Sequence, residues 1–369
     1  MPCTVSSVVP LLPLLGHDAL IDRLVQSAAA GTLPASLLLH GPRGVGKQRV
    51  ALELAQALLC EGTGRKPCGS CQQCRFASQL VHPDIHWYFP MERKDVHDTP
   101  EAVRKQYREW QAERGADGGL YAPPSGSTGL FVEATRAVVL SATVSPAMAK
   151  RKVFIIGDAD RMISQEGSDQ AANAFLKLLE EPPADTTLII TTSEPGGLLP
   201  TIRSRVVSMR VPPIPEPLVA QFFDDERVQK WLRKPDKEAG MQWGRSERVE
   251  RAQGAPGEIL AQPAKKGARD RAEKLMGAIR KGDRAELLRA AFAQGAMGAR
   301  GPYAETLDAL TELLRDMARD AVRRNDARTA LGAARAVDRV EMAKERASNN
   351  ANPQLVTQAL LRDIGGMFS

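Results

Sequence analysis

A glycine-rich turn between a strand-like run and a helix-like run constrains this chain most. Residues 37–48 read Leu-Leu-Leu-His-Gly-Pro-Arg-Gly-Val-Gly-Lys-Gln, and apolar residues at helical spacing follow. This is nearly the phosphate-binding loop G-x-x-x-x-G-K-[ST], whose glycines let backbone N–H groups face phosphate oxygens beside a helix N-terminus. We therefore expect an α/β domain with a phosphate cradle made by Gly41, Gly44, Gly46 and Lys47.

The residues that should hold Mg²⁺ depart from this motif at two places. The hydroxyl residue after the lysine is replaced by Gln48, which can coordinate a hard cation only through its carbonyl and with a different reach. A P-loop ATPase usually ends a neighbouring strand with Asp-Glu. Here Gly157 takes the first of these positions and Asp158 the second. We expect weak or absent hydrolysis by this chain, whereas nucleotide binding without turnover stays open.

Four of the five cysteines lie close together in the sequence. Cys60, Cys68, Cys71 and Cys74 have the spacing C-x7-C-x2-C-x2-C. C-x2-C turns direct their sulfurs at one centre, and four thiolates complete tetrahedral Zn²⁺ without an open position. We predict a structural, non-catalytic zinc module over 60–82. The alternatives are four free cysteines on a loop and a reactive dithiol, and no thioredoxin-like context supports the second.

The order of strand and helix patterns predicts the domain organisation. Strand-like runs alternate with helices up to about Val211, which indicates a doubly wound parallel sheet. The polar segment 90–129 is expected to be a surface excursion with a helix around 101–113 and a flexible end. A proline-rich stretch at 212–217 predicts a stiff linker, and only helical patterns follow. The predicted domains are a P-loop domain with the zinc module inserted (1–212), a small helical lid (213–265) and a C-terminal helical domain (266–369).

Charge and hydropathy restrict the partners and the cellular compartment that we expect for the protein. The net charge of +6 and the pI of about 9.1 are compatible with nucleic acid or acidic protein partners without being diagnostic. No run reaches the roughly 18–20 apolar residues that span a bilayer. The apolar patch at 8–15 contains two prolines and lacks a basic lead, so we do not interpret it as a signal peptide. We expect a cytoplasmic protein without membrane contact, in which grouped thiols favour metal over disulfide.

Three later segments bring out a family resemblance. Residues 173–183 read Asn-Ala-Phe-Leu-Lys-Leu-Leu-Glu-Glu-Pro-Pro, residues 188–195 read Leu-Ile-Ile-Thr-Thr-Ser-Glu-Pro, and residues 199–206 read Leu-Pro-Thr-Ile-Arg-Ser-Arg-Val. With the P-loop and the four cysteines in the same order, the chain resembles the clamp-loader subunits of bacterial DNA polymerase III, which are AAA+ proteins. The resemblance is specific over about 15–260 and architectural over the helical tail, where it implies an oligomerising collar domain.

Within this family the chain is most similar to the non-motor, delta-prime branch. Motor members carry an intact loop, a full Asp-Glu and an arginine in the lid, where this chain has Pro256-Gly257. The resemblance implies that Arg205 acts in trans as an arginine finger on ATP in a neighbouring subunit, with Arg203 as the second candidate. It also implies that Thr192, with Ser193, is a remnant of a polar sensor. The nucleotide-site residues carried over are Gly41, Gly44, Gly46, Lys47, Gln48, Asp158 and Thr192.

The resemblance also implies the function and the partners. The chain is expected to join gamma/tau and delta subunits in a hetero-pentamer that loads the sliding clamp onto primed DNA, with clamp and DNA contacts made by the assembled complex. The alternative is an ATP-hydrolysing, gamma/tau-like motor subunit of the same complex. A zinc-containing nucleotide kinase is disfavoured by the helical tail. An independent DNA-binding zinc module is disfavoured because 60–82 carries few basic and aromatic residues.

Overall fold

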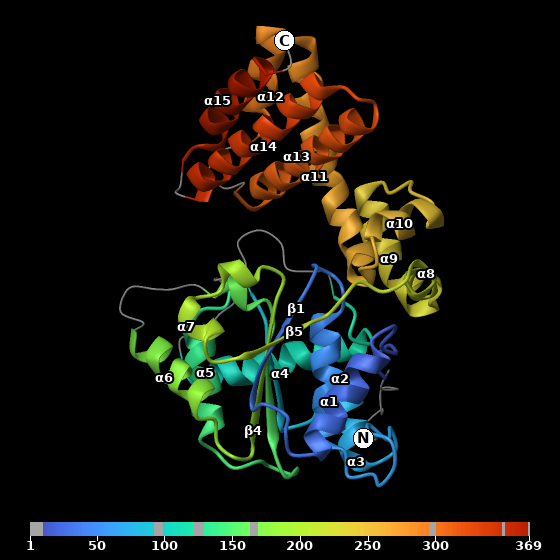
Figure 1. Cartoon of the computed structure of the whole chain (residues 1–369), viewed down its shortest axis with the longest axis vertical. Coiled ribbons are helices and arrows are strands. Elements are labelled where there is room, and N and C mark those ends of the chain that lie inside the picture. The colour runs from blue at the N-terminus through green and yellow to red at the C-terminus, as the bar shows by residue number, and fades with distance from the viewer. Residues whose placement is uncertain are drawn as a thin grey trace, which may run out of the picture. The chain divides into compact units, whose positions relative to one another are not determined.

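The computed structural model describes residues 10–91, 99–121, 129–162, 169–294, 300–348 and 351–367. The chain divides into two compact units (Figure 1). The first holds most residues up to Ala261, and the second holds most residues from Gln262 onward together with Pro235–Met241. Within the described part of the chain, no helix combines the length and the apolar character needed to cross a membrane.

The first unit is built on a five-stranded parallel sheet with the order β2-β3-β4-β1-β5. The strands are β1 (Ser36–His40), β2 (Ile85–Tyr88), β3 (Lys152–Ile156), β4 (Thr186–Thr192) and β5 (Val207–Arg210). The side chains of β1 to β4 are almost all buried, as suits strands covered on both faces, whereas those of the edge strand β5 are mostly exposed. In the centre of the sheet Leu38 of β1 lies opposite Ile190 of β4 and is almost completely buried. The predicted doubly wound parallel sheet is confirmed.

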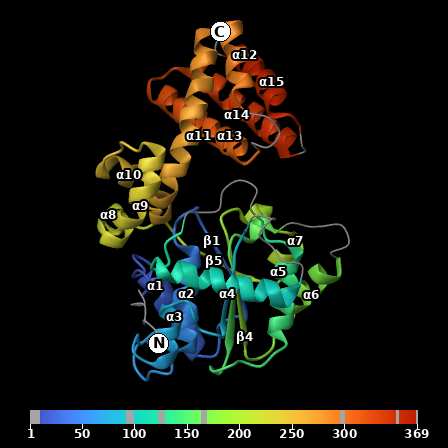
Figure 2. The ribbon, with the colours of Figure 1, turned by 180° about the vertical axis from the view of Figure 1, so that it is seen from behind.

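Helices cover both faces of this sheet (Figures 1 and 2). One side carries α1 (Asp18–Ala29), α2 (Lys47–Leu59) and α3 (Gln72–Ser78), and the other carries α5 (Val132–Ala142), α6 (Asp169–Glu180) and the short α7 (Pro200–Arg203). Leu54 of α2 and Phe175 of α6 belong to the same buried core as Ile155 of β3. The sheet therefore holds its loops, including the glycine-rich turn, on a rigid base.

Helix α4 (Pro100–Ala116) confirms the helix predicted around 101–113 but corrects the prediction that this segment is a surface excursion. Its inner face is buried, because Tyr107 Oη donates to the carbonyl of Phe89 at 2.7 Å and Gln111 Nε2 donates to that of Trp87 at 2.9 Å. The many polar residues on its outer face obscured this packing in the sequence. Residues 122–128 of the predicted flexible end lie outside the described residues.

A small helical part of the first unit follows β5. It contains α8 (Glu216–Asp224), the first part of α9 (Glu226–Ala239), α10 (Arg245–Ala252) and the start of α11 (Pro256–Lys281). Its own apolar core includes Val219, Leu232 and Ile259. The proline-rich linker is docked onto this part, since Ile214 N–H donates to the Gly254 carbonyl at 2.9 Å.

The second unit is helical throughout its described residues. Besides most of α11 it contains α12 (Arg284–Phe292), α13 (Arg300–Arg323), α14 (Ala327–Ser348) and α15 (Pro353–Gly365). Buried leucines at helical spacing, such as Leu307, Leu310 and Leu314, form its core with Val340 and Leu361. The predicted all-α C-terminal region is therefore present. The exact boundaries at 212/213 and 265/266 remain predictions.

Candidate functional site

The glycine-rich turn joins β1 to α2 and lines a cavity of about 430 Å³ in the first unit. Gly46 begins α2 in the left-handed region, with φ of 100°. A Cβ at Gly41 would lie 2.2 Å from the carbonyl oxygen of Val211, so only glycine fits there. The helix has no side-chain cap and no acidic residue in its first turn. Its first N–H groups, which have no partner within the helix, therefore suit an anion.

Lys47 is buried within its own loop. Its ammonium group donates to the carbonyl oxygens of Gly41 (3.1 Å) and Pro42 (2.8 Å) and to Ser193 Oγ (2.8 Å). Burial is the main cause that lowers the pKa of Lys47 to about 8, against a smaller opposing effect of Asp158. The phosphate cradle thus retains the ammonium group of Lys47. A bound phosphate would have to replace some of its present acceptors or bind beside them.

Gln48 fills the position where a Mg²⁺ ligand is expected. Its Nε2 donates to Asp158 Oδ2 at 2.9 Å, and its Oε1 accepts the indole N–H of Trp87 at 2.8 Å. A Cβ built on Gly157 would lie 2.5 Å from Gln48 Oε1. The amide is therefore bound at both ends, and the glycine at the strand end makes room for it. Sequence reasoning found Gln48 and Gly157 but missed Trp87, which lies in a run of apolar strand residues.

The acidic and hydroxyl groups beside the cradle are bound to one another. Burial raises the pKa of Asp158, although the nearby Lys47 opposes this. Thr192 Oγ1, at the end of β4, donates to Asp160 Oδ1 at 2.5 Å and accepts the N–H of Glu194 at 2.9 Å. Of the two predicted sensor residues, Ser193 contacts Lys47 directly, whereas Thr192 is engaged by Asp160.

Two contacts around the loop were not found from the sequence. The start of α11 reaches the loop, where Gly257 N–H donates to the Gly44 carbonyl at 2.8 Å. The buried ring of His17 lies on the other side, with Nε2 2.9 Å from the Val45 carbonyl. Burial lowers the pKa of His17, which favours the neutral ring. Neither contact has a local sequence signal, because each depends on packing between distant segments.

Arg205 lies on the surface between α7 and β5. Its side chain is 28% exposed, and its Nε and Nη2 lie 2.6 and 2.5 Å from Glu180 Oε1, at the end of α6. Nη1 donates to the carbonyl of Thr201 at 2.8 Å and to Ser204 Oγ at 3.3 Å. The second candidate, Arg203, is also exposed. Neither arginine lines the cavity of the cradle.

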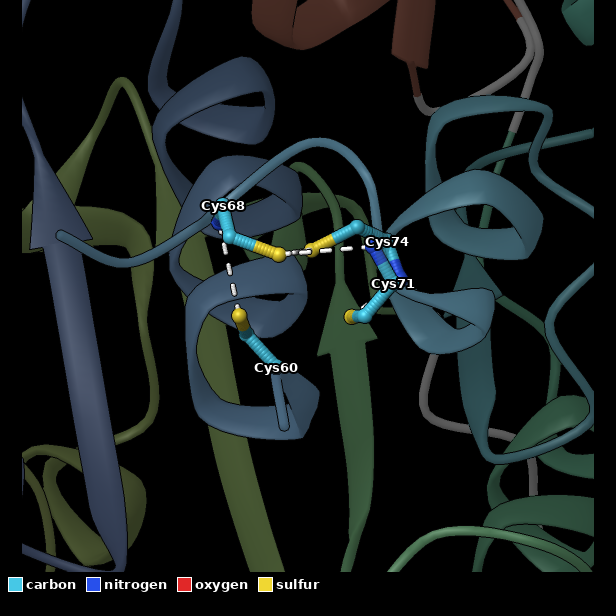
Figure 3. A group of neighbouring side chains, drawn as sticks. All are labelled: Cys60, Cys68, Cys71 and Cys74. Atoms are coloured by element: carbon cyan, nitrogen blue, oxygen red, sulfur yellow. Dashed lines mark hydrogen bonds between the residues drawn. The ribbon is translucent and has the colours of Figure 1, made fainter. Parts of the chain in front are cut away.

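The four cysteines form one cluster between α2 and α3 (Figure 3). All four Sγ atoms lie within 4.8 Å of one another, close to the roughly 3.8 Å between sulfurs in a tetrahedral Zn–S4 site. Backbone N–H groups point at them: Cys68 N is 3.3 Å from Cys60 Sγ, and Cys74 N is 3.4 Å from Cys71 Sγ. The N–H of Cys71 is the main cause that lowers the pKa of Cys68 to about 5. The prediction that these thiols converge on a possible metal centre is confirmed.

The sheet order, the loop between β1 and α2, and the helices after β5 define a P-loop α/β protein of the AAA+ class. A family model described as "DNA polymerase III, delta subunit" matches residues 16–215, more than half of the chain. The chain belongs to this family, as the sequence resemblance predicted.

Curated relatives match the same part of the chain. The DNA polymerase III subunit delta' of Pseudomonas aeruginosa is 32% identical over 47% of this chain and 42% of its own length, and that of Escherichia coli is 30% identical over 56% and 50%. A subunit tau of Salmonella typhimurium is 29% identical over 54% of this chain and 25% of its own length. The alignments thus span at most about half of these relatives.

One solved structure is similar along almost the whole chain. It is a gamma-subunit-related protein of Thermotoga maritima, which is 16% identical and covers 95% of this chain and 99% of its own. The TM-score is 0.47. The fold assignment therefore depends on the sheet and the family match.

Proposed function

We propose that this chain is the non-motor, delta-prime-like subunit of a bacterial clamp loader and that it contributes an arginine to ATP hydrolysis by a neighbouring subunit. The observation that carries the proposal is the Gln48 amide, bound by Asp158 and Trp87 in the metal position. A P-loop enzyme needs Mg²⁺ there to neutralise charge on the transferring phosphoryl group. The delta' names of the first relatives support this role over the gamma/tau-like alternative.

The cradle itself supports binding of a nucleotide without hydrolysis. The uncapped start of α2 and the ammonium of Lys47 offer positive charge to phosphate oxygens. Gly41, Gly44 and Gly46 keep the backbone close enough for such contact, and Asp158 lines the same cavity, while Thr192 lies behind it, bonded to Asp160. In this proposal a bound nucleotide holds the loop and the lid together and is not turned over.

Arg205 is the proposed arginine finger. Its guanidinium can stabilise the charge that develops on a γ-phosphate across a subunit interface, which an arginine does better than a lysine because its planar fork makes two bonds. The partners are proposed to be gamma/tau and delta subunits, held through the helices of the 266–369 domain. Contacts with the sliding clamp and primed DNA are proposed for the assembled complex.

The test is ATP hydrolysis by a complex reconstituted from purified subunits. Arg205→Ala should lower the DNA- and clamp-stimulated rate by about tenfold or more, since an arginine finger contributes about 10³–10⁵ to kcat at the site that it serves. Arg203→Ala, two residues away in the same surface segment, is the matched control and should leave the rate near wild type. Equal effects of both variants, no effect of Arg205→Ala, or brisk hydrolysis by the isolated chain would contradict the proposal.

We also propose that the cysteine cluster holds one structural zinc ion. The donor set is complete with Cys60, Cys68, Cys71 and Cys74, so the ion would organise the loop between α2 and α3 and leave no position for substrate. Metal analysis of the purified chain should find about one zinc per chain. Cys74→Ser should lose the metal and lower the melting temperature, whereas Cys3→Ser should change neither. A metal-free chain as stable as the metal-containing one would contradict this proposal.

A further inference from the structure

The arginine proposed to act in trans is already bound to a carboxylate of its own chain. Glu180 Oε1 accepts from both Nε (2.6 Å) and Nη2 (2.5 Å) of Arg205, and Nη1 is engaged by Thr201 and Ser204. All three nitrogens of the guanidinium therefore have partners within one subunit. An incoming phosphate can only bind this group by replacing some of these partners.

The ion pair has the character of an exchangeable contact. The Arg205 side chain is 28% exposed and that of Glu180 is 45% exposed, so water screens the attraction and the pair contributes little to folding. A nucleoside triphosphate presents more negative charge than a single carboxylate and can bind the guanidinium through two oxygens. A diphosphate lacks the terminal group that would lie nearest to the finger. Replacing Glu180 by phosphate is thus favourable for Arg205 when the neighbouring site holds a triphosphate and unfavourable when it holds a diphosphate.

We propose that Glu180 is a positioning residue, which retains Arg205 within its own subunit until a γ-phosphate is present next door. This inference rests on the proposed role of Arg205. The carboxylate competes with the γ-phosphate for the guanidinium, so the ion pair weakens ATP binding in the neighbouring site. ADP lacks the γ-phosphate and is affected less. Glu180 acts through Arg205 and does not touch the nucleotide.

The sequence supplies a matched control. Glu181 follows directly in the Leu-Glu-Glu-Pro-Pro segment, is exposed, and makes no ion pair among the described residues. Neutralising either glutamate removes the same charge from the same surface. A difference between the two variants therefore reports the contact with Arg205 and not the general field of the subunit.

The experiment measures ATPase kinetics of the reconstituted complex with Glu180→Gln and Glu181→Gln. We expect Glu180→Gln to lower KM for ATP by roughly two- to fivefold, the range of a screened surface ion pair, with kcat and the inhibition constant of ADP little changed. Glu181→Gln should match wild type, and Glu180→Asp, which keeps the charge, should be intermediate. The difference should shrink as the salt concentration rises.

Each outcome separates the two proposals. A raised KM or a lowered kcat for Glu180→Gln would mean that the glutamate presents the arginine instead of retaining it, and would overturn the inference, as would unchanged constants. Combining Glu180→Gln with Arg205→Ala should give the kinetics of Arg205→Ala alone. If Arg205→Ala itself changes nothing, the proposed function fails, and the inference fails with it. Melting temperatures of all variants within a few degrees of wild type exclude a folding defect as the cause.

Discussion

The side-chain amide of Gln48 occupies the space that any side chain at Gly157 would need. A Cβ at Gly157 would lie 2.5 Å from Oε1 and 2.7 Å from Nε2 of Gln48, well inside contact distance. The two departures from the motor pattern are thus one structural arrangement. An acidic residue at the strand end requires a shorter residue after the lysine, and the long amide requires glycine.

This contact predicts a large cost for a very small substitution. Gly157→Ala should lower the free energy of unfolding by about 1–3 kcal/mol, because the new methyl group overlaps an amide that is hydrogen-bonded on both sides. Gly196→Ala is the matched control, since nothing lies within 4 Å of its Cβ position. Urea unfolding of the purified chain measures both. Equal losses in the two variants would contradict the argument.

The same contact predicts that the two positions are energetically coupled. In a double-mutant cycle, Gln48→Ala should remove most of the penalty of Gly157→Ala, which gives a coupling energy of about 1 kcal/mol or more. Additive losses would show that the alanine is accommodated by some other movement. For the same reason Gln48→Thr alone should not restore Mg²⁺-dependent hydrolysis, since Gly157 still provides no carboxylate.

The sequence predicted the strands and the loop of this site better than the contacts between its side chains. The strands and the loop follow local patterns, and the alternation of strand-like runs and helices up to about Val211 predicted the parallel sheet. The contact between Gln48 and Trp87 could not be predicted from the sequence. Trp87 has the pattern of any buried strand residue, and only the fold brings its indole N–H to the amide. The ion pair of Arg205 with Glu180 likewise joins segments 25 residues apart. Local patterns do not report such pairings.

The contact between the loop and the start of α11 leads to a further prediction. Gly44 has φ of 74°, and a Cβ there would lie 2.7 Å from the backbone nitrogen of Glu258. Gly44→Ala should therefore loosen α11 from the loop and speed hydrogen exchange of the Gly257 amide, which donates to the Gly44 carbonyl.

The control for this variant separates a steric clash from backbone strain. Gly31 has a similar φ of 70°, but nothing lies within 4 Å of its Cβ position. Gly31→Ala should lower the free energy of unfolding by about 1 kcal/mol, because alanine is strained in the left-handed conformation. Gly44→Ala should lower it by roughly 1–3 kcal/mol more, because the clash with α11 adds to this strain. If both variants lose the same stability and the Gly257 amide stays protected, the lid does not depend on this contact.

The buried ammonium of Lys47 predicts a pH dependence of stability. Its pKa is about 8 in the folded chain and near the ordinary 10.5 when unfolded, so between these values the unfolded state binds more protons. The free energy of unfolding should therefore rise with pH across this window, relative to Lys47→Met, by up to about 3 kcal/mol. Below pH 8 the penalty for burying the charge is fully present, and the two proteins should show parallel pH profiles.

Urea unfolding of wild type and Lys47→Met between pH 7 and 10.5 measures this difference, and groups common to both proteins cancel. Saturating ADP offers an internal check. A phosphate held beside Lys47 favours the charged form and raises its pKa, so the extra slope of the wild type should move to higher pH when ADP binds. Profiles that stay parallel throughout would show that the ammonium is solvated in the native state. A slope that ADP leaves unchanged would show that the nucleotide does not reach the cradle.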